Sequence, residues 1–170
     1  MEIWADEKKI SPEVFKYLSV QNPQRAYDLT KETLQAPENF DFTNDMNDYE
    51  NMGNSENLLE TMLNVVLNQD RTFAVQVINR NLLNEDIPTF QYFAVKSADL
   101  KDTSFVGQLF IRLEKDDNAH IYLKAAEALI AFNSKEINNR IVKTKKINGN
   151  LTKDWGGDEF SKLLKSKNIE

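Results

Sequence analysis

Residues 73–78 read FAVQVI, residues 105–110 read FVGQLF, and residues 137–142 read INNRIV. The apolar positions of these hexamers recur at a constant interval, from Phe73 to Phe105 to Ile137, which we call the repeat step. Within each copy they have the i, i+3, i+4 spacing of one helical face. A second stripe keeps the same repeat step and spacing, and consists of Leu58, Met62 and Val66; Phe90, Ala94 and Ala98; Tyr122, Ala126 and Ile130. Two stripes in every repeat step predict a pair of antiparallel helices that is repeated three times.

The polar side of the repeat also recurs in part. Gln76 and Arg80 step to Gln108 and Arg112, whereas Asn138 interrupts the apolar pattern of the third copy. Since any two amphipathic helices can be aligned on their apolar faces, an irregular helical bundle remains the alternative to a repeated pair.

The rest of the chain also predicts helices. Ser11-Pro12-Glu13 and Asn22-Pro23 have the capping residue and first-turn proline that begin a helix. We therefore predict an all-α fold of eight or nine helices in a single domain of residues 1–170. Its parts are a two-helix cap (1–35), an acidic loop (36–55), the helical-pair repeats (56–146), and a loop with a short helix (147–170). Trp155-Gly156-Gly157 is interpreted as a turn, with Asp158 capping the last helix.

The periodicity resembles that of HEAT-like and armadillo-like α-solenoids, over about half of the chain. The resemblance implies a short right-handed array in which the second helix of each pair lines a concave binding surface. Gln76, Arg80, Gln108 and Arg112 would then form a ladder that faces a ligand. In the alternative, Arg80 and Arg112 pair with nearby acidic residues between repeats.

Charge is distributed unevenly along the chain. Residues 1–60 hold 13 Asp and Glu against 5 Lys and Arg, while residues 132–170 hold 5 against 9, within a formal net charge of −6. An acidic first part argues against nucleic acid, because neutralising phosphates requires a basic face. It favours a basic protein partner that is attracted by charge, although acidity also keeps a small protein in solution.

Bulk composition narrows the setting. The chain has no cysteine, so a disulfide framework and a thiolate metal site are excluded. The first seven residues are acidic where a signal peptide would be basic, and apolar runs of about five residues are far shorter than the roughly 20 of a membrane helix. We expect a soluble, cytoplasmic protein that binds neither a membrane nor nucleic acid.

The predicted loop of residues 36–55 alternates carboxylates with aromatic side chains at no steady period. It is interpreted either as a partner-binding loop or as a flexible connection at the surface. A calcium loop beginning at Asp45 is rejected, because Tyr49 occupies a ligand position and Glu50 the position of the turn glycine. The candidate partner-binding residues are Asp41, Asp45, Asp48, Tyr49 and Glu50.

Catalytic signatures are absent from the sequence. The single histidine, His120, has no nucleophile-elbow motif with it, and glycine is too scarce for a phosphate-binding loop. Metal sites built from two or more His or Cys are excluded. We expect no enzyme activity, no cofactor and no metal.

The function class that we favour is a protein-binding module. In general character the chain is similar to bacterial immunity proteins, which neutralise a toxin domain, often a basic nuclease, by covering its active site. A scaffold or adaptor that binds a cellular protein or peptide in a concave groove is the alternative. A helical enzyme that acts through carboxylates is a third hypothesis.

Overall fold

A computed structural model describes residues 12–35 and 52–170, and residues 1–11 and 36–51 lie outside this description. The described residues form nine α-helices and two short 3-10 helices, with no strand among them, which confirms the all-α prediction. None of these helices is both long enough and apolar enough to cross a membrane. Two compact units divide the chain, Met1–Val77 and Ile78–Glu170, and each is described by itself.

The first unit is built on three helices that pack against one another in pairs. These are α1 (Pro12–Gln21), α2 (Pro23–Gln35) and α3 (Met52–Gln69), followed by the start of α4 (Arg71–Asn81). Phe15, Ala26 and Met62 form a buried cluster between the three helices. The α3 helix begins inside the predicted 36–55 loop, because Met52–Ser55 are helical.

Asp70 connects α2 to the turn between α3 and α4. Its carboxylate accepts hydrogen bonds from the backbone N–H of Phe73 at 3.0 Å and from the Tyr27 hydroxyl at 2.9 Å. The ammonium of Lys31 lies 3.8 Å away. The pKa of Asp70 is held below its ordinary value, because these three groups favour the charged carboxylate. The Phe73 N–H has the largest effect, followed by the Tyr27 hydroxyl and then by Lys31.

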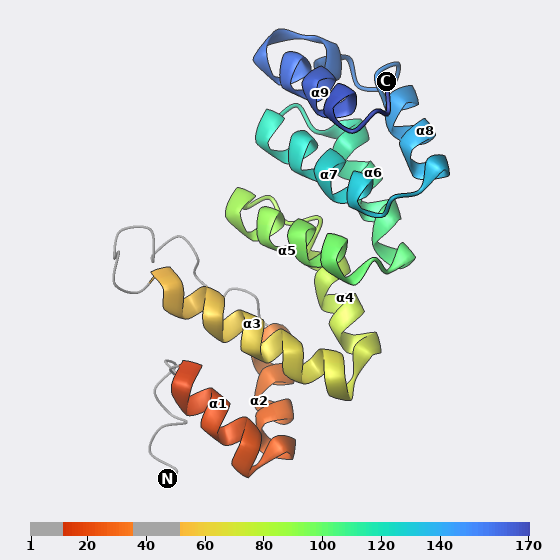
Figure 1. Cartoon of the computed structure of the whole chain (residues 1–170). Helices are drawn as coiled ribbons and strands as arrows, with labels where there is room; N and C mark the ends of the chain where they lie inside the picture. Colours follow the sequence, from red (N-terminus) through yellow and green to blue (C-terminus); the bar gives the residue numbers. More distant parts are fainter. Residues whose placement is uncertain (1–11, 36–51) are drawn as a thin grey trace. The chain divides into compact units, whose positions relative to one another are not determined.

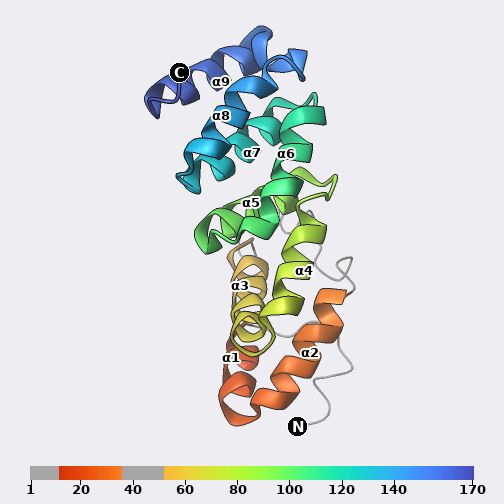
Figure 2. The ribbon, with the colours of Figure 1, turned by 90° about the vertical axis from the view of Figure 1, so that its right-hand side faces the viewer.

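The second unit is organised around α7 (Ala119–Ala131), which packs on four other helices (Figures 1 and 2). Ala125, Ala126 and Ala128 are buried on α7, and such small side chains let neighbouring helices approach closely. The four neighbours are α5 (Ile87–Leu100), α6 (Val106–Lys115), α8 (Lys135–Thr144) and α9 (Asp154–Ser166). The 3-10 helices span Thr103–Phe105 and Gly149–Thr152.

The repeat step reappears in the helix caps. Asp70, Asp102 and Ser134 are separated by one repeat step each, and each caps the second helix of a pair or the 3-10 turn that leads into it. Asp86 and Asn118 cap the first helices, α5 and α7. Each side chain accepts a hydrogen bond from a backbone N–H that the helix itself leaves unpaired.

Chain reversal after α5 and α7 follows the same interval. Lys101 and Asn133 lie one repeat step apart, and both adopt left-handed backbone conformations, with φ of 50° and 53°. The predicted apolar stripes face inward as well: Met62, Ala94 and Ala126, at equivalent positions of three successive copies, are all buried.

The C-terminal end of α6 is held by a residue that follows α8. The Asn148 side-chain amide donates to the carbonyl of Leu113 at 3.0 Å and to that of Asp116 at 2.8 Å. Such bonds supply partners for the carbonyls that the last turn of a helix leaves open.

The prediction for the last helix was wrong at its start. The α9 helix begins at Asp154, so Trp155, Gly156 and Gly157 are helical and Asp158 lies within the helix. Both glycines are buried at close approaches. A Cβ on Gly157 would lie 2.7 Å from the Thr152 carbonyl carbon, and one on Gly156 would lie 1.7 Å from the Tyr122 hydroxyl. Packing therefore places glycine in a helix that glycine alone would weaken.

Candidate functional site

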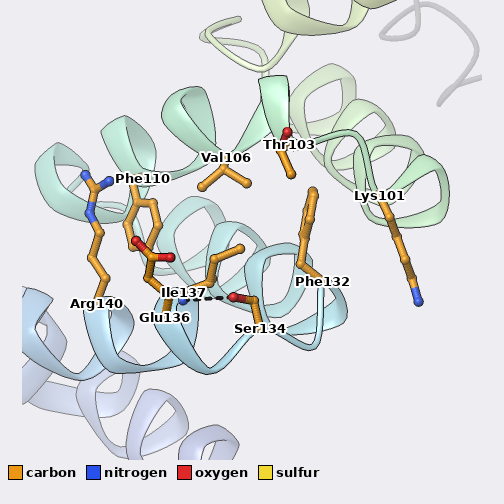
Figure 3. Close-up of a pocket in the computed structure, with 9 residues that line it drawn as sticks. All are labelled: Lys101, Thr103, Val106, Phe110, Phe132, Ser134, Glu136, Ile137 and Arg140. Carbon is orange, nitrogen blue, oxygen red and sulfur yellow. Dashed lines mark hydrogen bonds between the residues drawn. The ribbon is translucent and has the colours of Figure 1, made fainter.

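An open groove of about 370 Å³ lies between α6 and α8 and is the best candidate for a binding site (Figure 3). Its floor is apolar, with Phe110 fully buried and Val106, Phe132 and Ile137 partly exposed. Polar side chains form its rim: Lys101, Thr103, Ser134, Glu136 and Arg140. The two turns that follow α5 and α7 supply much of this lining, so the caps that recur at the repeat step also shape the groove.

Arg140 closes one end of the groove. Its guanidinium carbon lies 3.7 Å from the centre of the Phe110 ring, and its Nη2 donates to Oε1 of Glu114 at 2.8 Å. This stacked ion pair joins α8 to α6. Figure 3 shows that the Lys101 side chain points away from the other lining residues.

The groove combines an apolar floor with a capping hydroxyl and charged side chains at its edge. The Ser134 hydroxyl accepts from the backbone N–H of Ile137 at 3.4 Å and so acts as a helix cap. His120 lies elsewhere, beside Trp155, with their ring centres 5.7 Å apart. Across the described ranges, no three His, Asp or Glu side chains gather where they could hold a metal ion. The groove can bury apolar groups and offer hydrogen bonds at its edge.

The sequence-predicted ladder is not a uniform exposed surface. Gln76 and Arg80 are exposed on α4, while Gln108 is half-buried and its Oε1 has no hydrogen-bond partner within the described residues. Arg112 is 5% exposed. It therefore cannot face a ligand beside the other three, and the alternative interpretation, pairing with nearby acids, describes this residue.

Arg112 is surrounded by groups from three parts of the second unit. Its Nε lies 3.1 Å from Oδ2 of Asp116, and its Nη2 donates to the Asn84 carbonyl at 3.2 Å. Its Nη1 lies 3.6 Å from Glu85, and its guanidinium stacks 5.0 Å from the centre of the Phe90 ring. Burial raises the pKa of Asp116 and Arg112 opposes that rise, so the two charges compensate each other inside the fold.

The other predicted site residues, Asp41, Asp45, Asp48, Tyr49 and Glu50, lie outside the described residues. The groove itself was not predicted. Two signals for it were present: Arg140 stands one repeat step after Gln108, and the Asn133-Ser134 turn stands one repeat step after Lys101-Asp102.

Comparisons with known proteins give no assignment. No protein-family model matches the chain, and neither the curated proteins nor the solved structures contain a significant match.

Proposed function

We propose that this chain is a protein-binding module that receives an apolar segment of a partner protein in the groove between α6 and α8. The observation that carries the proposal is the apolar floor of Val106, Phe132 and Ile137, partly exposed and bordered by polar side chains. A protein interface commonly has this composition, an apolar centre within a polar rim.

Magnitudes indicate how much of an interface the groove supplies. Completing the burial of three partly exposed side chains contributes about 1 kcal/mol each, since full burial is worth roughly 1.5–3 kcal/mol. A total of about 3 kcal/mol is below the roughly 4 kcal/mol of a millimolar complex. A stable complex therefore needs further contacts beyond the groove.

Within this class, we propose that the chain acts in the cytoplasm as an immunity protein that neutralises a basic toxin domain by covering its active site. The net charge of −6 and the acidic residues of positions 1–60 support this proposal, because they attract a basic partner. A scaffold or adaptor that binds a cellular peptide is the alternative, and the groove favours it to the same degree.

The test pairs a groove variant with an exposed control. Ile137→Asp places a charge on the floor of the groove, whereas Ile147→Asp changes a side chain that is 64% exposed and is not part of the groove. Thermal melts followed by circular dichroism establish that both variants fold. Each variant is then co-expressed with the product of the neighbouring gene, and cell survival is measured.

An immunity protein is expected to protect cells as wild type and as Ile147→Asp, but not as Ile137→Asp. Equal protection by all three would show that the groove is not the contact surface. If wild type gives no protection, the immunity proposal is wrong. The adaptor alternative then predicts that peptides selected from a display library for binding to wild type do not bind Ile137→Asp. Selected peptides that bind both proteins equally would contradict it.

A further inference from the structure

The first turn of α9 presents an aromatic side chain among carboxylates. Trp155 is 56% exposed, and its ring lies beside the exposed ring of His120. Asp158 and Glu159 stand three and four residues after Trp155, which places them beside it on one face of the helix, and Asp154 directly precedes it at the first position of α9. A large exposed aromatic side chain surrounded by polar groups is typical of the residues that dominate binding energy.

Two of these carboxylates are available to a partner. Glu159 is held by Lys162 at 2.7 Å, but no ion pair within the described ranges involves Asp154 or Asp158. Lys153, the neighbouring cation, extends toward Gly149: its Nζ would lie 3.8 Å from a Cβ placed there. The three carboxylates of this turn outnumber its two cations, Lys153 and Lys162, although residues 132–170 carry more basic than acidic side chains.

A buried hydroxyl opens onto the same turn. Tyr122 on α7 is 2% exposed, and its hydroxyl lies against Gly156, where any Cβ would collide with it. No residue in the described part of the chain forms a hydrogen bond with this hydroxyl. Burial raises the pKa of Tyr122, and the charge of Asp154 raises it further. Because Gly156 has no Cβ, there is room at this turn for the Tyr122 hydroxyl, which has no hydrogen-bond partner in the described part of the chain. Asp154 carries a free carboxylate on the same turn.

We propose that Trp155, Asp154 and Tyr122 form an anchor site for an arginine side chain of the partner protein. The guanidinium stacks on the indole of Trp155, donates to the carboxylates of Asp154 and Asp158, and donates to the hydroxyl oxygen of Tyr122. Arginine fits better than lysine, because its planar group can stack and make several directed hydrogen bonds together. This inference rests on the proposed protein-binding function and supplies the contact beyond the groove that a stable complex requires.

The experiment uses the full chain and three peptide probes: triarginine, trilysine and tricitrulline amides. Trilysine keeps the charge, and tricitrulline keeps the shape without the charge. Each probe is titrated at low ionic strength while NMR follows the indole N–H of Trp155 and the backbone amides of residues 154–158. Triarginine is expected to give saturable shifts, trilysine to bind about 2- to 5-fold more weakly, and tricitrulline to cause no shift.

Variants assign the effect to the anchor site. Trp155→Ala is expected to abolish the triarginine shifts, and Asp154→Asn and Tyr122→Phe to weaken binding at least about 2-fold each. Ile147→Ala, at another exposed apolar side chain of this unit, should bind triarginine as wild type does. Thermal melts distinguish a lost contact from a lost fold, since Trp155 is too exposed for its removal to unfold the helix.

Three results would overturn the proposal: shifts of equal size with tricitrulline, binding of triarginine that Trp155→Ala leaves unchanged, or stronger shifts of the same amides with inorganic phosphate. The last would identify an anion site at the end of the helix, as for a nucleic-acid backbone. Ile137→Asp should leave the triarginine titration intact. Failure of the groove and failure of the anchor site therefore give different results.

Discussion

At the scale of single residues, the stability of the fold depends on the partners of one buried charge, that of Arg112. The guanidinium is enclosed by Asp116, the Asn84 carbonyl and the ring of Phe90, while Glu85 on its outer side is largely exposed. Removing Arg112 is costly, because the Asp116 carboxylate then remains without its cation in a poorly solvated place.

Arg112→Ala is expected to lower the free energy of unfolding by about 3–5 kcal/mol, because it leaves Asp116 partly buried without its cation. Urea denaturation measures the change. The matched control is Arg140→Ala, whose ion pair with Glu114 is half-exposed and should cost less than about 1 kcal/mol. Adding Asp116→Asn should recover part of the loss in Arg112→Ala. Similar losses in the two arginine variants would contradict the buried network.

Asp70 supplies the pH dependence. Its folded-state pKa is lower than the ordinary 3.8, so the unfolded chain binds the proton more tightly. The stabilisation is therefore fully present well above pH 3.8 and is lost as the pH falls below that value. We expect Asp70→Asn to be less stable than wild type at neutral pH, and the difference to shrink through this acidic range. Chemical denaturation at several pH values measures it, and a difference that does not change with pH would exclude the carboxylate as its source.

Sequence patterns could not show that Arg112 is buried. The pattern places Arg112 at the position of Arg80, which is exposed. Its partners Asn84 and Glu85 stand nearly one repeat earlier in the chain and come close only when α6 packs. The capping residues were predictable, because Asp70, Asp102 and Ser134 act on N–H groups two or three residues away.

At the scale of elements, α9 depends on its two glycines. Alanine normally stabilises a helix by about 1 kcal/mol relative to glycine. At Gly157 the added Cβ would meet the backbone of Thr152, and at Gly156 it would meet the Tyr122 side chain and, at 2.9 Å, the Cβ of Ala119. Gly107, the second residue of α6, has open space around it.

Gly156→Ala and Gly157→Ala are expected to destabilise the protein by about 1–3 kcal/mol, the usual effect of overpacking. Gly107→Ala should stabilise it by about 0.5–1 kcal/mol, because helix propensity acts there without a collision. Thermal or urea denaturation measures all three. Tyr122→Phe should restore part of the stability of Gly156→Ala by removing the colliding hydroxyl. If alanine stabilised all three positions equally, the close approaches at Gly156, against α7, and at Gly157, against Thr152, would be wrong.

The start of α9 was mispredicted for the same reason. Local rules interpret two adjacent glycines as a break and a following Asp as a cap. Lys153 at the actual boundary makes no side-chain capping bond, so no local signal marks it. The contact between Gly156 and Tyr122 that explains the first glycine joins two helices that are distant in the sequence. By contrast, the repeat step was predictable, because each pair repeats its caps and its inward-facing stripe.

At the scale of the whole molecule, the net charge of −6 bears on how fast a partner arrives. Opposite charge raises the rate of encounter, and salt screens that attraction over about 10 Å at 0.1 M. In the proposed complex, the apolar groove and the partner's arginine on Trp155 would act after encounter and would change mainly the rate of dissociation.

A basic partner is therefore expected to associate more slowly as salt rises, by about tenfold or more, while its dissociation rate changes less. Stopped-flow mixing of the two proteins measures both rates. Ile137→Asp should speed dissociation with little effect on the salt dependence of association. An association rate that is insensitive to salt would argue against the basic toxin and in favour of an uncharged peptide.

The C-terminal end of α6 is bonded to two segments, one earlier and one later in the chain. Arg112 donates a hydrogen bond to the segment that precedes α5, and Asn148, which follows α8, donates to the carbonyls of Leu113 and Asp116. Neither segment can lift away without breaking bonds to this one turn. The amide protons of this last turn of α6 should therefore exchange with deuterium only when the entire second unit opens. Exchange should be slower there than at the ends of α8 or α9.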